Sequence, residues 1–134
     1  MTVRVQRCID LDEALDAPAR ARRIATDFLT EAERACGGPV SPAVTDAVLL
    51  VTSELVTNAV RHAPGPCTLR LNLYDESVLV KSATPAPAPR DPAPRTLPGR
   101  GGGWGWTLIA RVANEVRVTP GPGGGKTVLA RLPW

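Results

Sequence analysis

A long amphipathic segment over residues 42–63 constrains the fold of this chain more than any other feature. Ser41 supplies a capping hydroxyl before it, Pro42 suits the first helical position, and Pro64 ends the pattern. On a wheel of about 100° per residue, five apolar side chains of this segment form one stripe. The stripe consists of Val44, Val48, Val51, Leu55 and Ala59. The pattern predicts a long helix that buries one face in a hydrophobic core.

Polar side chains interrupt this stripe in the second half of the helix. Asn58 lies inside the stripe, about 60° from its centre, and His62 lies in the middle of it. Glu54 lies on its flank, beside Arg61. Burying an unpaired amide or carboxylate costs roughly 2–7 kcal/mol or more. Either the helix opens onto a cavity at these positions or it leaves the core after Leu55, and periodicity alone does not separate the two.

The remaining segments predict a sheet covered by helices. A first helix runs from a cap at Asp16 to about Cys36, where Gly37-Gly38 stops it, and a short helix covers 106–113. Alternating or β-branched runs predict strands at 3–9, 68–73, 78–80, 115–119 and 126–132. Consecutive antiparallel strands with helices that must share one face indicate an α+β fold. We expect a two-layer α/β sandwich with a mixed, mostly antiparallel sheet and helices on one face.

Composition is typical of one globular domain, which we expect to span residues 1–134. Hydrophobic residues make up 43% and charged residues 22% of the chain. Cys8, Cys36 and Cys67 have no paired spacing, which excludes a disulfide framework or a cysteine zinc site and fits a reducing cytoplasm. No unbroken apolar run approaches the ~18 residues of a membrane span, so we expect no membrane partner. The net charge of +3 is spread along the chain and does not by itself predict direct nucleic-acid binding.

The second half of the long helix carries a recognisable motif. Residues 53–63 read Ser-Glu-Leu-Val-Thr-Asn-Ala-Val-Arg-His-Ala, which resembles the N box of the GHKL ATPases. In particular it resembles the anti-sigma-factor serine/threonine kinases of bacterial partner-switching systems and their stand-alone relatives. The resemblance covers nearly the whole chain. It implies ATP and Mg²⁺ as ligands and a cytoplasmic regulator that binds a sigma factor and phosphorylates an anti-anti-sigma antagonist, and it leaves a homodimer open.

The resemblance also implies roles for four residues of this helix. Asn58 would give its side-chain oxygen to a magnesium ion that bridges the nucleotide phosphates, since Mg²⁺ takes few protein ligands. Glu54 would act as general base on the attacking hydroxyl. Arg61 would meet phosphate charge, or it is a solvated arginine. His62 would line the nucleotide site, or it serves only the helix dipole in the last turn.

A glycine-rich stretch precedes the short third helix. Residues 83–105 are dense in proline and glycine, and they end in a run that includes Gly99, Arg100, Gly101 and Gly103. Glycines let backbone N–H groups approach phosphate closely, and a helix start adds a favourable dipole. The stretch resembles the ATP lid and G2 box of the same family, although a flexible linker has the same composition. By the same resemblance, Thr127 on the last strand would line the adenine pocket, or it is an ordinary strand threonine.

One position departs from the family pattern. The G1 box of the family places an aspartate at the end of a middle strand, where it binds the adenine amino group, and here Ser82 occupies that position. A hydrogen bond to a charged group contributes about 1.5–3 kcal/mol, so its loss would weaken ATP by roughly ten- to a hundredfold. Two functions remain open: a weakly ATP-binding kinase, or a partner-binding module with a degenerate ATP site. A sensor histidine kinase fragment is disfavoured because His62 lies within the N box.

Overall fold

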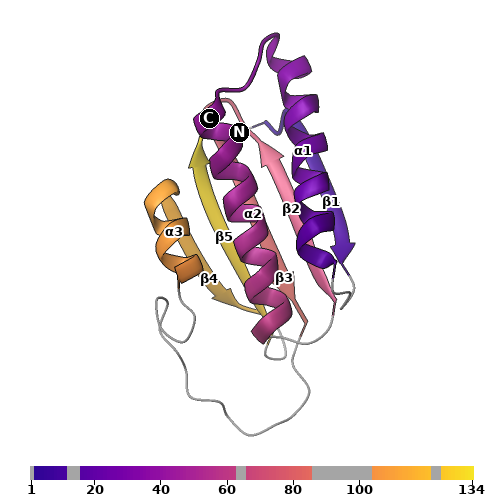
Figure 1. The fold of residues 1–134 in the computed structure, drawn as a ribbon, viewed down its shortest axis with the longest axis vertical. Coiled ribbons are helices and arrows are strands. Elements are labelled where there is room, and N and C mark those ends of the chain that lie inside the picture. Colours follow the sequence, from indigo (N-terminus) through magenta and orange to yellow (C-terminus); the bar gives the residue numbers. More distant parts are fainter. Residues whose placement is uncertain (1, 12–15, 63–65, 86–103, 122–124) are drawn as a thin grey trace, which may run out of the picture.

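The structure, a computed structural model, describes residues 2–11, 16–62, 66–85, 104–121 and 125–134. Within these ranges the chain forms five strands in one sheet and three helices that lie on the same face of it (Figure 1). The strands are β1 (Val5–Leu11), β2 (Cys67–Leu73), β3 (Ser77–Thr84), β4 (Glu115–Pro120) and β5 (Lys126–Pro133). The helices are α1 (Ala17–Cys36), α2 (Pro42–His62) and α3 (Trp104–Val112). The expected two-layer α+β sandwich is confirmed.

The strand order in the sheet is β1-β2-β3-β5-β4. All four pairings between described strands are antiparallel, so the parallel pair that a mixed sheet would contain does not occur among them. Strand β3 lies between β2 and β5, with Ser82 opposite Val128 and Thr84 opposite Lys126. The second strand of the final hairpin, β5, therefore pairs along the whole of β3, while the first, β4, forms the edge of the sheet.

The ends of α1 and α2 follow their local sequences. The Val44 N–H donates to Ser41 Oγ at 3.2 Å, which confirms the predicted cap of α2. Helix α1 ends at Gly37, whose φ of 74° is the left-handed conformation that glycine adopts without strain, and whose N–H donates to the Glu33 carbonyl at 2.9 Å. The prediction for Asp16 was wrong in one respect, because its side chain makes no capping hydrogen bond. Its backbone carbonyl instead accepts the Arg20 N–H at 2.9 Å.

Helix α2 crosses the middle of the sheet, between α1 and α3 (Figure 1). Four of the five stripe residues are buried, and Val44 is partly buried against the same core. By length and composition alone, Pro42–Arg61 is long and apolar enough to cross a membrane, although its apolar residues do not form an unbroken run. Since Val48, Val51 and Leu55 are at most 1% exposed within the packed domain, α2 is the central core helix of this fold.

The other face of the sheet is polar. Alternation along each strand places Arg70 and Lys81 there, directly opposite each other on β2 and β3. At the edge of the same face, Arg131 Nε lies 3.4 Å from a carboxylate oxygen of Glu115. This face is typical of a solvated antiparallel sheet whose second face carries the core.

Candidate functional site

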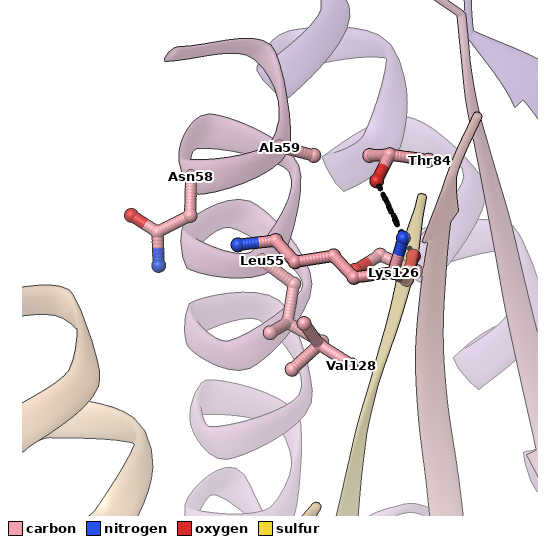
Figure 2. A pocket seen from close by; sticks show the side chains of 7 residues that line it. Leu55, Asn58, Ala59, Thr84, Lys126 and Val128 are labelled. Carbon is pink, nitrogen blue, oxygen red and sulfur yellow. Dashed lines mark hydrogen bonds between the residues drawn. The ribbon is translucent and has the colours of Figure 1, made fainter. Parts of the chain in front are cut away.

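A pocket opens between the C-terminal half of α2 and the paired ends of β3 and β5 (Figure 2). The space between these elements amounts to about 240 Å³ when the open solvent at its mouth is counted with it. Seven described residues line it: Leu55, Asn58, Ala59, Ser82, Thr84, Lys126 and Val128. The helix contributes an apolar wall and one amide, and the two strands contribute two hydroxyls and an ammonium group.

Asn58 reaches this pocket because it belongs to the buried stripe of α2. Its side chain is 8% exposed, and its neighbour Ala59 is 4% exposed, so the helix stays in the core beyond Leu55. Of the two interpretations open from the sequence, the cavity is therefore confirmed. The Asn58 Nδ2 is buried and has no hydrogen-bond partner in the described residues. A buried polar group of this kind costs about 1–3 kcal/mol when it is left unpaired, which makes Asn58, inside a pocket, a candidate for contact with a ligand.

Ser82 lies on the helix-facing side of β3 and is 2% exposed. No aspartate or glutamate lines the pocket among the described residues, so the departure from the family pattern at Ser82 is not compensated there. The charged group that does line the pocket is the ammonium of Lys126. At the mouth, the Thr84 hydroxyl donates to the Lys126 carbonyl at 3.3 Å, and the Lys126 N–H lies 3.4 Å from the same hydroxyl oxygen. These contacts hold the ends of β3 and β5 together.

Glu54 and Arg61 flank the pocket and do not line it. Glu54 is half-buried one turn before Asn58, and Arg61 is exposed one residue before the end of α2. His62 is the last residue of α2, and only its backbone belongs to the described part of the chain. The structure thus brings Asn58 and Ser82 together and places Glu54 on the adjacent helix surface.

The predicted role of Thr127 does not fit this pocket. Its two neighbours, Lys126 and Val128, line the pocket, and successive side chains of a strand point to opposite faces. Thr127 therefore lies on the polar face of the sheet. The sequence held a signal for the residue that faces the pocket, because Val128, Ala130 and Leu132 alternate as the apolar face of β5 and Lys126 continues that alternation.

The predicted lid is only partly within the described residues. Strand β3 extends through Thr84 and helix α3 begins at Trp104, so both ends of the 83–105 stretch belong to regular elements. The glycine-loop residues predicted to bind phosphate lie outside the described residues; they are Gly99, Arg100, Gly101 and Gly103.

Comparison with known families identifies the domain. A model of the histidine kinase-like ATPase domain matches residues 14–132, nearly the whole chain. The chain belongs to this family. A search of curated proteins found no significant match. Membership confirms the GHKL-type resemblance and makes this an ATP-binding domain, whereas its assignment to the anti-sigma-factor kinases stays a prediction.

The pocket residues of this histidine kinase-like ATPase fit a nucleotide with its metal ion. No group of three or more histidine, cysteine, aspartate or glutamate side chains gathers among the described residues, but Mg²⁺ needs few protein ligands and keeps several waters. The Asn58 carboxamide offers one oxygen as such a ligand, and its buried, unpaired N–H offers a donor to a phosphate oxygen. The donor set thus suits a nucleotide with an oxygen-coordinated cation.

Proposed function

We propose that this protein is a cytoplasmic serine/threonine kinase of the anti-sigma-factor type, which binds a sigma factor and phosphorylates an anti-anti-sigma antagonist. The observation that carries the proposal is the buried, unpaired amide of Asn58 in a pocket that it shares with Ser82. Support also comes from membership of the histidine kinase-like ATPase family and from the N-box sequence on α2. The sigma factor and the antagonist follow from the resemblance of that motif to partner-switching kinases.

In this proposal the chemistry belongs to two residues one helical turn apart. Asn58 would hold Mg²⁺, which would offset phosphate charge when bound. Glu54 would accept the proton of the substrate serine hydroxyl as the serine oxygen bonds to the γ-phosphorus of ATP. The bond from that phosphorus to the bridging oxygen breaks, and ADP leaves. Glu54 suits this role because it lies beside the pocket and does not fill it.

A second candidate is a nucleotide-independent module that binds its partner through the same fold. The observation that favours it is Ser82, which is buried where the family pattern has an aspartate. A neutral hydroxyl binds the adenine amino group less strongly than a carboxylate does. On this alternative the pocket would be a remnant and the protein would act by binding alone.

Titration of ATP with and without Mg²⁺, followed by phosphate transfer to a serine-containing antagonist, separates the two candidates. We expect Glu54→Ala to abolish transfer and to leave Mg·ATP binding largely intact, and Asn58→Ala to lose the Mg²⁺-dependent part of binding. Matched controls are Glu31→Ala, on the exposed side of α1, and Asn114→Ala, at an exposed turn. Full transfer by both pocket variants would remove these assignments, and no binding by the unmodified protein would favour the binding module.

A further inference from the structure

Lys126 has an unusual position for a lysine. It is the first residue of β5, on the strand face that also carries Val128 and Ala130 against the helices. Figure 2 shows its side chain extended from the strand across the pocket toward α2. Among the described residues no carboxylate lies within ion-pair distance of its ammonium group, since the described salt bridges join other residues. The Lys126 ammonium group therefore lines the pocket without a negatively charged partner among the described residues.

The pocket presents hydrogen-bond donors from two different elements. Lys126 is a donor only, with three N–H groups and no acceptor. Asn58 adds an Nδ2 that is buried and has no partner, from the facing helix. A carboxylate in the pocket would have satisfied such donors, but the position deeper along β3 is Ser82. Two unpaired donors, one of them charged, match an anionic ligand whose oxygens accept several hydrogen bonds.

We propose that Lys126 binds a phosphate of the nucleotide, and that affinity at this site depends on that phosphate more than on the adenine amino group. The proposal rests on the proposed nucleotide binding, and it specifies that the phosphate is the part of the nucleotide that this pocket recognises. The neutral Ser82 hydroxyl contributes less to recognition of the base than a carboxylate would. The Lys126 ammonium makes a charge-assisted bond to phosphate, and such bonds are roughly twice as strong as neutral ones. Base selectivity is therefore weak and phosphate dependence strong.

The test compares Lys126→Gln with the unmodified protein by calorimetry on ATP, ADP, AMP and adenosine in the presence of Mg²⁺. We expect Lys126→Gln to weaken ATP by about ten- to a hundredfold, the usual range for losing a hydrogen bond to a charged group. Adenosine affinity stays within about twofold, because the nucleoside has no phosphate to lose. Lys126→Arg keeps the charge and retains most of the ATP affinity. The affinity of the unmodified protein falls more steeply with salt than that of Lys126→Gln.

Lys81→Gln is the matched control. Lys81 is half-buried on neighbouring β3 but faces the opposite side of the sheet, beside Arg70 and Leu129 in register. The Lys81→Gln substitution removes one positive charge outside the pocket, so we expect the affinity for ATP to stay unchanged. If thermal melting shows that Lys126→Gln is destabilised, Lys126→Met, which keeps the aliphatic stem, makes the same comparison.

Three results would overturn the proposal, and they are distinguishable. Equal ATP affinity in Lys126→Gln and the unmodified protein would refute the phosphate contact and leave nucleotide binding standing. If Lys126→Gln loses affinity for ATP and for adenosine by the same factor, Lys126 contacts the nucleoside and not a phosphate. No ATP binding by the unmodified, folded protein would overturn this proposal together with the proposed function.

Discussion

The two sides of the helical layer are built from different residues. On the α1 side, the buried face is small and apolar, with Ala21, Ala25 and Phe28 fully buried. This helix packs against β1 and against α2. On the other side, the C-terminal half of α2 meets β3 and β5 through Asn58 and Ser82, two of the buried polar residues of the described chain. The α1 side stabilises the fold through apolar packing, whereas the α2–β3–β5 side holds buried polar residues, one of which, Asn58, has an Nδ2 with no hydrogen-bond partner in the described residues.

The largest expected effect is on the apolar side. Phe28→Ala removes a fully buried aromatic ring of α1 and should lower the free energy of unfolding by about 3–5 kcal/mol, because both its burial and its packing are lost. Chemical denaturation measures this, with exposed Thr30→Ala as the control on the same helix. The folded fraction should bind ATP as before. A loss below about 1 kcal/mol, or a specific loss of ATP affinity, would contradict the division between the two regions.

On the pocket side, Ser82→Asp tests the departure from the family pattern. We expect adenine nucleotides to bind more tightly by about 1–2 kcal/mol, because the carboxylate accepts a charge-assisted hydrogen bond from the adenine amino group. Guanine nucleotides should scarcely change, since their equivalent position carries an oxygen. The gain in affinity should be larger for adenosine than for ATP. The new carboxylate also attracts Lys126, which is two residues from the partner of residue 82 on β5, and so draws its ammonium group away from a phosphate.

Calorimetry with adenosine, ATP and GTP on the two folded proteins measures both effects. A folded Ser82→Asp variant that still binds no ATP would show that more than one residue of the site is degenerate. The partner-binding module would then become the leading function.

Asn58→Leu should change stability and binding in opposite directions. Leucine removes a buried, unpaired amide and keeps a similar volume, so we expect the free energy of unfolding to rise by about 1 kcal/mol. Mg²⁺-dependent ATP binding should be lost. Chemical denaturation measures the free energy of unfolding and calorimetry measures ATP affinity on the same samples. Asn114→Leu, at an exposed turn, is the control. A destabilised variant would mean that Asn58 is paired within the folded chain in solution.

The smallest effect concerns the thiol of Cys67, at the start of β2 and 1% exposed. Burial raises its pKa from 9.0 to about 11, while a hydrogen bond from the Ala83 backbone opposes part of the rise. The thiol therefore loses its proton at a lower pH in the unfolded chain than in the folded chain. Stability that is fully present below pH 9 should decline as the pH rises from 9 toward 11.

Denaturation midpoints across this pH range, compared with those of Cys67→Ala, isolate the contribution of the thiol. The alanine variant should show a shallower decline. Thiol reagents at neutral pH should modify the exposed Cys8 and Cys36 well before Cys67. Rapid modification of Cys67 in the folded protein would contradict its burial.

Local features were predictable because they depend on neighbouring residues. The serine and proline at 41–42 set the start of α2, and Gly37 ends α1, since capping and a positive φ act within one turn of chain. The polar interruption of the α2 stripe identified Asn58, because helical periodicity is itself local. The motif on the same helix pointed to the family that the domain comparison confirms.

What only the tertiary structure decided is which distant residues share the pocket. Ser82 and Lys126 meet because β5 pairs with β3 and leaves β4 at the edge, and the hairpin sequence does not say which of its strands lies inside. A shift of one residue along a strand moves every side chain to the other face, so the choice between Lys126 and Thr127 depends on that pairing and on the helix packed above it. By itself the sequence determined a family, a core helix and one buried amide. The long-range pairing of β3 with β5 placed a lysine beside that amide, because strand register is set by contacts between segments far apart in the chain.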